Sequence, residues 1–153
     1  MFQPPDPNFR ERVRASFARQ QVMATLGIEM VHLEPGEVHL TMLPDPAYTQ
    51  QHGFMHAGII TTALDSACGY AAFTLMPPDA AVLTVEFKTN LLAPAKGDRF
   101  VFRGPGHQAR PNADHLRSPR VGAGGIEREA HRDDDGHTDG RHRAAGHRAL
   151  TGR

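Results

Sequence analysis

The sequence has no tryptophan, only one cysteine and no net charge over its 153 residues. A single cysteine, Cys68, cannot form an internal disulfide, which fits a reducing compartment. Zero net charge excludes the basic field typical of nucleic-acid-binding and membrane-surface proteins. No apolar run approaches the ~20 residues that span a bilayer, and residues 1–7 lack a secretory signal. We therefore expect a soluble, cytoplasmic protein with neither nucleic acid nor membrane as a partner.

Aromatic residues are absent beyond Phe102. Residues 104–153 also contain few large aliphatic side chains: Leu116, Val121, Ile126 and Leu150. The same segment holds six of the ten histidines and nine of the fifteen glycines. Such a composition buries too little apolar surface to offset the entropy of ordering the chain. The sequence thus predicts a folded domain over residues 1–103 and a disordered tail over residues 104–153.

A shift of reading frame would explain this tail. Read one base later, the codons for Asp133 to Arg141 are compatible with Thr-Met-Thr-Ala-Thr-Leu-Met-Ala, a strand-like sequence. The codons for His107 to Arg117 are likewise compatible with Ile-Lys-Pro-Gly-Arg-Thr-Leu-Thr-Ile. A natural tail that binds metal or nucleic acid is the alternative, but no spacing there resembles a metal site and its charges are not grouped by sign. We interpret residues 104–153 as a frameshift product.

The first third of the chain predicts a helix followed by a hairpin. Apolar residues at helical spacing run from Phe9 to Leu26, with Asn8 as the N-cap and Gly27 as the C-cap. Alternating runs over residues 28–33 and 38–43 then flank a Pro-Gly turn, which predicts two antiparallel strands.

The middle of the chain predicts one buried helix and two strands. Residues 56–75 place apolar side chains around most of a helix, as in helices buried on most sides. Residues 81–92 alternate over a long span, and residues 99–103 begin a further strand. Strands around one central helix indicate an α+β fold with an antiparallel sheet.

Asp65 is the only charged residue between Asp45 and Asp79, and it lies in the most apolar helix of the chain. Burying an isolated carboxylate is costly, so the group should be hydrogen-bonded, altered in pKa or directed into a cavity. Such a carboxylate is a candidate general base or nucleophile. A buried aspartate that serves only a structural hydrogen-bond network is the alternative, and the residue by itself leaves both open.

A glycine-containing loop over residues 50–58 leads directly into the N-terminus of this helix. Free backbone N–H groups at a helix N-terminus can hold an oxyanion. Asp65 lies nine residues after His56, two and a half turns along the helix. A loop donor, a helix N-terminus and a carboxylate that face the same side can polarise a carbonyl and direct water at it. Alone, His56 is typical of a helix start; in this group it is a candidate orienting residue.

Together these segments resemble the PaaI-like (phenylacetate-degradation-type) hotdog acyl-CoA thioesterases over about residues 10–103. The resemblance rests on Gln50, Gly53, His56-Ala57-Gly58, Leu64-Asp65, Gly69-Tyr70-Ala71-Ala72, Leu83-Thr84-Val85-Glu86-Phe87-Lys88, Leu91, Pro94-Ala95 and Gly97-Asp98. It implies a hotdog fold, in which an antiparallel sheet wraps a central helix, here with its C-terminal strands missing or disordered.

The resemblance implies hydrolysis of an acyl-CoA thioester to a free acid and coenzyme A. Asp65 matches the general base or nucleophile, and the N–H groups near Ala57 and Gly58 match the oxyanion hole. His56 matches a residue that shapes this loop. Thr84 matches a position, reached from a partner subunit, that helps to place water.

The resemblance also implies a role for Gln50 in catalysis and for Gly53 and Ala57 in substrate binding. Gln50 stands where many members have Asn, and Ala57 where many have Gly. Members are typically homodimers or dimers of dimers, with the active site between subunits. Neither a metal nor another cofactor is implied.

Two other functions stay open: a hotdog hydratase or dehydratase, and a non-catalytic acyl-CoA-binding protein. Because family contacts to coenzyme A lie partly on the missing strands, loss of activity through the altered C-terminus is a third possibility.

Overall fold

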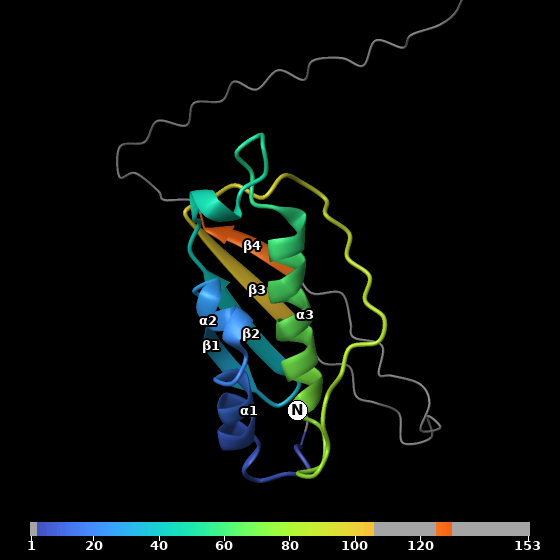
Figure 1. Ribbon diagram of the computed structural model, residues 1–153. Coiled ribbons are helices and arrows are strands. Elements are labelled where there is room, and N and C mark those ends of the chain that lie inside the picture. The colour runs from blue at the N-terminus through green and yellow to red at the C-terminus, as the bar shows by residue number, and fades with distance from the viewer. Residues whose placement is uncertain (1–2, 106–124, 130–153) are drawn as a thin grey trace, which may run out of the picture.

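The computed structural model of the chain describes residues 3–105 and the backbone of residues 125–129. The elements in chain order are α1 (Phe9–Phe17), α2 (Gln21–Thr25), β1 (Glu29–Glu34), β2 (Glu37–Met42), a 3-10 helix η1 (Pro46–Tyr48), α3 (Ala57–Phe73), β3 (Arg99–Pro105) and β4 (Gly125–Glu129). The four strands form one antiparallel sheet in the order β1-β2-β3-β4, and α3 crosses one face of it (Figure 1). The predicted α+β architecture is confirmed. Within the described ranges, no helix is long and apolar enough to cross a membrane.

The single N-terminal helix predicted over residues 9–26 is wrong, because the chain forms α1 and α2 with a break between them. Gln20 adopts an extended conformation at the break, and its Oε1 accepts a hydrogen bond from Ser66 Oγ (3.3 Å). The break allows Phe9 of α1 and Met23 of α2 to enter the same core. Asn8 occupies the predicted N-cap position of α1, although its side chain makes no capping bond there.

The predicted hairpin is confirmed as β1 and β2. Gly36 in its turn has a φ of 78°, a left-handed conformation that glycine adopts readily. The N–H of Gly36 donates to Thr74 Oγ1 (2.7 Å), just beyond the C-terminal end of α3. This bond fixes the turn of the hairpin to the central helix.

The predicted buried helix is confirmed as α3, which packs against β2 and β3. Its residues Ala63, Ala67 and Ala71 are fully buried, and these small side chains let the sheet approach closely. Phe100 and Phe102 of β3 are completely buried in the same core. Apolar packing against the sheet thus holds the central helix in place, and charged groups on the helix do not.

Gly104, near the end of β3, lies against the backbone of α3. A Cβ atom at this position would collide with the Ala67 carbonyl group and lie 2.6 Å from Cys68 N. We expect Gly104→Ala to lower the free energy of unfolding by about 3 kcal/mol or more, because backbone atoms cannot turn aside as a flexible side chain can. Urea denaturation followed by circular dichroism measures this change.

Gly69→Ala is the matched control. A Cβ at Gly69, on α3, meets no atom within 4 Å. Alanine there should leave stability unchanged or raise it by ~0.5–1 kcal/mol through helix propensity. Equal stability of the two variants would contradict the close packing of β3 on α3.

The strand predicted over residues 81–92 is wrong: this segment runs beside α3 without forming a strand (Figure 1). A strand needs a neighbour to accept its backbone hydrogen bonds, and no described strand lies beside this segment. Leu83, Val85 and Leu92 are 81%, 74% and 94% exposed. These three apolar side chains are therefore exposed, with no described element covering them.

The predicted domain boundary at residue 103 is crossed by β3, which continues through Gly104 and Pro105. β4 also lies within the segment for which the sequence predicts disorder. Pairing with β3 requires only backbone groups, so an apolar-poor sequence is able to supply β4. Residues 106–124 and 130–153, where the remainder of the predicted tail falls, lie outside the described residues.

Candidate active site

Asp65 projects from the middle of α3 and is half-buried between the buried residues Leu64 and Ser66. Its Oδ1 accepts a hydrogen bond from Thr84 Oγ1 (2.8 Å), which lies on the extended segment beside the helix. One carboxylate oxygen is therefore fixed by a neutral donor. In the structure, Thr84 donates this bond to Asp65 of the same chain. The family resemblance implies instead that Thr84 is reached from a partner subunit.

His56 is the N-cap of α3, and its Nδ1 accepts a hydrogen bond from the Gly58 N–H (2.9 Å). The backbone N–H of His56 donates to the Tyr48 carbonyl (2.8 Å). Gly58 thus already uses the N–H group that the family resemblance assigns to an oxyanion hole. The N–H of Ala57 has no acceptor among residues 3–105, and so it is the donor available at this helix end.

The loop before the helix is closed on itself by short-range bonds. The Gly53 N–H donates to the Gln50 carbonyl (2.9 Å), and Gly53 has a φ of 79°. The side-chain Oε1 of Gln50 accepts from the His52 N–H, so this oxygen shapes the loop. The Met55 N–H donates to the Ala95 carbonyl (3.0 Å), a support from a distant segment that no local sequence pattern revealed.

Within one chain, Asp65 lies far along α3 from the N–H donor at the N-terminus of the helix. Asp65 follows Ala57 by eight residues, which is about 12 Å along the axis at 1.5 Å per residue. An oxyanion donor and a general base must each lie within about 3 Å of atoms bonded to the same carbonyl carbon. Along one helix the two groups are therefore too far apart for a single carbonyl, and their joint action on one carbonyl stays a prediction.

Comparison with known proteins gives the family. A sequence model described as the thioesterase superfamily matches residues 52–104, which include His56, α3, Thr84 and Gly104. The crystal structure of a thioesterase family protein from Silicibacter pomeroyi is 64% identical, with 63% of this chain and 71% of that chain covered, and a TM-score of 0.63.

More distant relatives agree with this result. The PaaI protein of the Escherichia coli phenylacetic acid degradation operon is 19% identical over 64% of this chain and 70% of its own, with a TM-score of 0.58, and shares the fold. Two proteins of Saccharolobus solfataricus whose names class them with esterases are 31% and 33% identical over 55% and 54% of this chain. The chain covers 59% and 54% of their lengths. The chain belongs to the thioesterase superfamily and has its hotdog fold.

Proposed function

We propose that the protein hydrolyses acyl-coenzyme A thioesters to a carboxylic acid and coenzyme A in the cytoplasm. The observation that carries this proposal is the hydrogen bond between Thr84 and Asp65, which lies on the central helix of a thioesterase-superfamily fold. A family match indicates a hydrolase, and Asp65 is the one charged group on the helix that the family match covers.

In the proposed reaction, Asp65 takes a proton from water while the water oxygen attacks the thioester carbonyl carbon. The tetrahedral intermediate then breaks its C–S bond, and the thiolate leaves and is protonated. Thr84 holds Oδ1 of Asp65, which leaves Oδ2 for the water. Direct attack by Asp65, with hydrolysis of the resulting anhydride, uses the same residue as nucleophile.

The negative charge on the carbonyl oxygen would be held by the Ala57 N–H at the positive end of α3. His56 fixes the first turn through its hydrogen bond from the Gly58 N–H, next to the Ala57 donor. Gln50 and Gly53 maintain the loop that leads to this donor. These residues are positioning groups, whereas Asp65 and the Ala57 N–H would contact the reacting atoms.

We further propose that two copies of the chain complete the site, as a homodimer or a dimer of dimers. About 12 Å separates Ala57 from Asp65 along one helix, so the two groups must come from different copies to act on one carbonyl. The exposed apolar residues Leu83 and Val85 flank Thr84, and Leu92 on the same segment is also exposed, so this segment offers a surface for such a contact.

The altered tail is a separate proposal. We propose that the chain beyond residue 104 is translated out of frame, because the composition changes there and residues 81–92 have no described strand beside them. The close fit of Gly104 against α3 favours that residue being within the authentic frame. Resequencing the gene tests this: a frame that encodes two further apolar strands supports the proposal, and the absence of one contradicts it.

Release of free thiol from acyl-CoA, followed with a thiol reagent, tests the proposed reaction. A thioesterase releases coenzyme A, whereas a hydratase or dehydratase changes the acyl chain and leaves the thioester intact. Binding of acyl-CoA without thiol release, by both this chain and one with its frame restored, would favour the non-catalytic alternative.

A further inference from the structure

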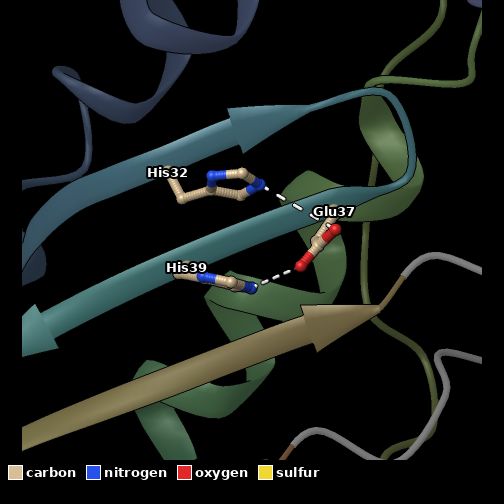
Figure 2. A group of neighbouring side chains, drawn as sticks. All are labelled: His32, Glu37 and His39. Atoms are coloured by element: carbon tan, nitrogen blue, oxygen red, sulfur yellow. Dashed lines mark ion pairs between the residues drawn. The ribbon is translucent and has the colours of Figure 1, made fainter.

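Three side chains on the β1–β2 hairpin converge on a single point, away from Asp65 and α3. His32 on β1 and His39 on β2 are directly opposite each other in the strand register, and Glu37 lies two residues before His39. Residues two apart on a strand share a face, so all three project from the same side of the sheet. Figure 2 shows them in front of the strands, with the central helix behind.

The geometry of the three groups is compact. Glu37 Oε1 lies 2.7 Å from His39 Nε2, and Glu37 Oε2 lies 3.8 Å from His32 Nε2. The two imidazole rings stack with centroids 4.5 Å apart. One ligand atom from each residue falls within 4.8 Å of the others. Two imidazole nitrogens and a carboxylate oxygen are a common ligand set for zinc in proteins.

His32 supplies an independent observation. Its Nε2 atom is buried and has no hydrogen-bond partner among the described residues, although it points toward the carboxylate of Glu37 (Figure 2). Buried nitrogen atoms are normally paired, and here the nearest Glu37 oxygen, at 3.8 Å, lies beyond hydrogen-bond distance. A cation placed between His32, Glu37 and His39 would satisfy this nitrogen.

His39 is the most buried of the three side chains, with 13% of its surface exposed. Arg103 is the other polar neighbour, with Nη1 3.5 Å from His39 Nδ1. This guanidinium belongs to an exposed residue, and it would turn aside when Nδ1 carries the proton.

We propose that His32, Glu37 and His39 bind one Zn²⁺ ion per chain, through His32 Nε2, His39 Nε2 and a Glu37 carboxylate oxygen. Tetrahedral zinc holds its ligand atoms about 3.4 Å apart, so a separation of up to 4.8 Å must close by up to about 1.4 Å. His32 is part exposed and has room to rotate. Water takes the fourth position, and the ion links β1 to β2 near the turn of the hairpin.

The family resemblance implies no metal, and it gives these three residues no role. The available sequence signal was the spacing His32-x4-Glu37-x-His39 around a Pro-Gly turn. This spacing becomes a ligand pattern only when the strand register is known, because a shift of one residue would turn the two histidines to opposite faces.

Isothermal titration of the full chain with Zn²⁺, together with metal content after dialysis, tests the proposal. Six further histidines lie beyond residue 105 and give a background of weak binding. The informative quantity is therefore the difference between wild type and variants. We expect His39→Gln and Glu37→Gln each to weaken the tightest site at least ~10-fold and to remove one zinc equivalent. His32→Gln, at a more exposed position, is a second ligand-deletion variant that secures the test if His39→Gln fails to fold.

His52→Gln is the matched control, since His52 lies on the exposed loop before α3 and should keep the full zinc content. Zinc should also raise the melting temperature of wild type and of His52→Gln, but not of His32→Gln. Equal zinc content and equal affinity in all four variants and wild type would overturn the proposal and assign the binding to adventitious sites elsewhere in the chain.

Discussion

Replacing Asp65 with Asn is expected to lower the rate of thioester hydrolysis by about 10²- to 10⁴-fold, the range typical of a lost general base. Asn keeps the shape of Asp, and its carbonyl oxygen still accepts the hydrogen bond from Thr84. The variant should therefore fold normally and bind acyl-CoA with little change. The loss should appear in kcat, because the carboxylate acts in the transition state and contributes little to ground-state binding.

Asp79→Asn provides the control for this substitution, because Asp79 is an exposed aspartate just beyond the central helix. It should retain the wild-type rate. Steady-state release of thiol by wild type and both variants measures the effect. An Asp65→Asn variant that keeps more than about a tenth of the wild-type kcat would contradict a role as general base or nucleophile.

Replacing Ala57 with Pro should lower kcat by about 10²- to 10³-fold, because proline deletes the backbone N–H that is proposed to hold the oxyanion. Ala57 is the first residue of α3, a position where proline fits a helix. The preceding residue, His56, has φ −63° and ψ 135°, a conformation compatible with a following proline. The fold should survive while one donor is removed.

Ala57→Gly separates the N–H group from the side chain. This variant keeps the donor and shortens only the side chain, so its kcat should stay near the wild-type value. Circular dichroism and melting temperature establish that both variants are folded. Equal kcat in Ala57→Pro and Ala57→Gly would show that the Ala57 N–H does not contact the reacting oxygen.

Mixing the two inactive variants tests whether the site spans two copies. In a heterodimer of Asp65→Asn and Ala57→Pro chains, one composite site would carry both substitutions and the other neither. Random exchange of subunits should then restore about a quarter of the wild-type activity. Failure to recover activity, with exchange verified by tagged subunits, would place both groups in one chain or exclude one of them.

Local patterns predicted the hairpin and the buried helix because each depends on residues close together in the sequence. Alternation around Pro35-Gly36 indicated the two strands, and small apolar residues around Asp65 marked the central helix. The prediction failed where structure depends on distant neighbours. The helix over residues 9–26 breaks at Gln20, whose side chain bonds to Ser66 on another element.

In the candidate site, too, the sequence predicts what depends on nearby residues and not what depends on distant ones. Asp65 stands out in the sequence as a lone charge, yet its partner Thr84 could be assigned only through the family resemblance. The occupied N–H of Gly58 depends on the orientation of the His56 ring, which no sequence pattern specifies. Residues 81–92 alternate like a strand, but alternation cannot supply the neighbouring strand that such a segment needs.

The decisive measurement for thioester hydrolysis by Asp65 is the release of coenzyme A from acyl-CoA by wild type and by Asp65→Asn. It should be made on the 153-residue chain and on a chain in which the reading frame beyond residue 104 is restored. We expect thiol release by at least the frame-restored chain, lost in Asp65→Asn and retained in Asp79→Asn. No release by either chain, or equal release with and without the Asp65 carboxylate, would contradict the proposed reaction.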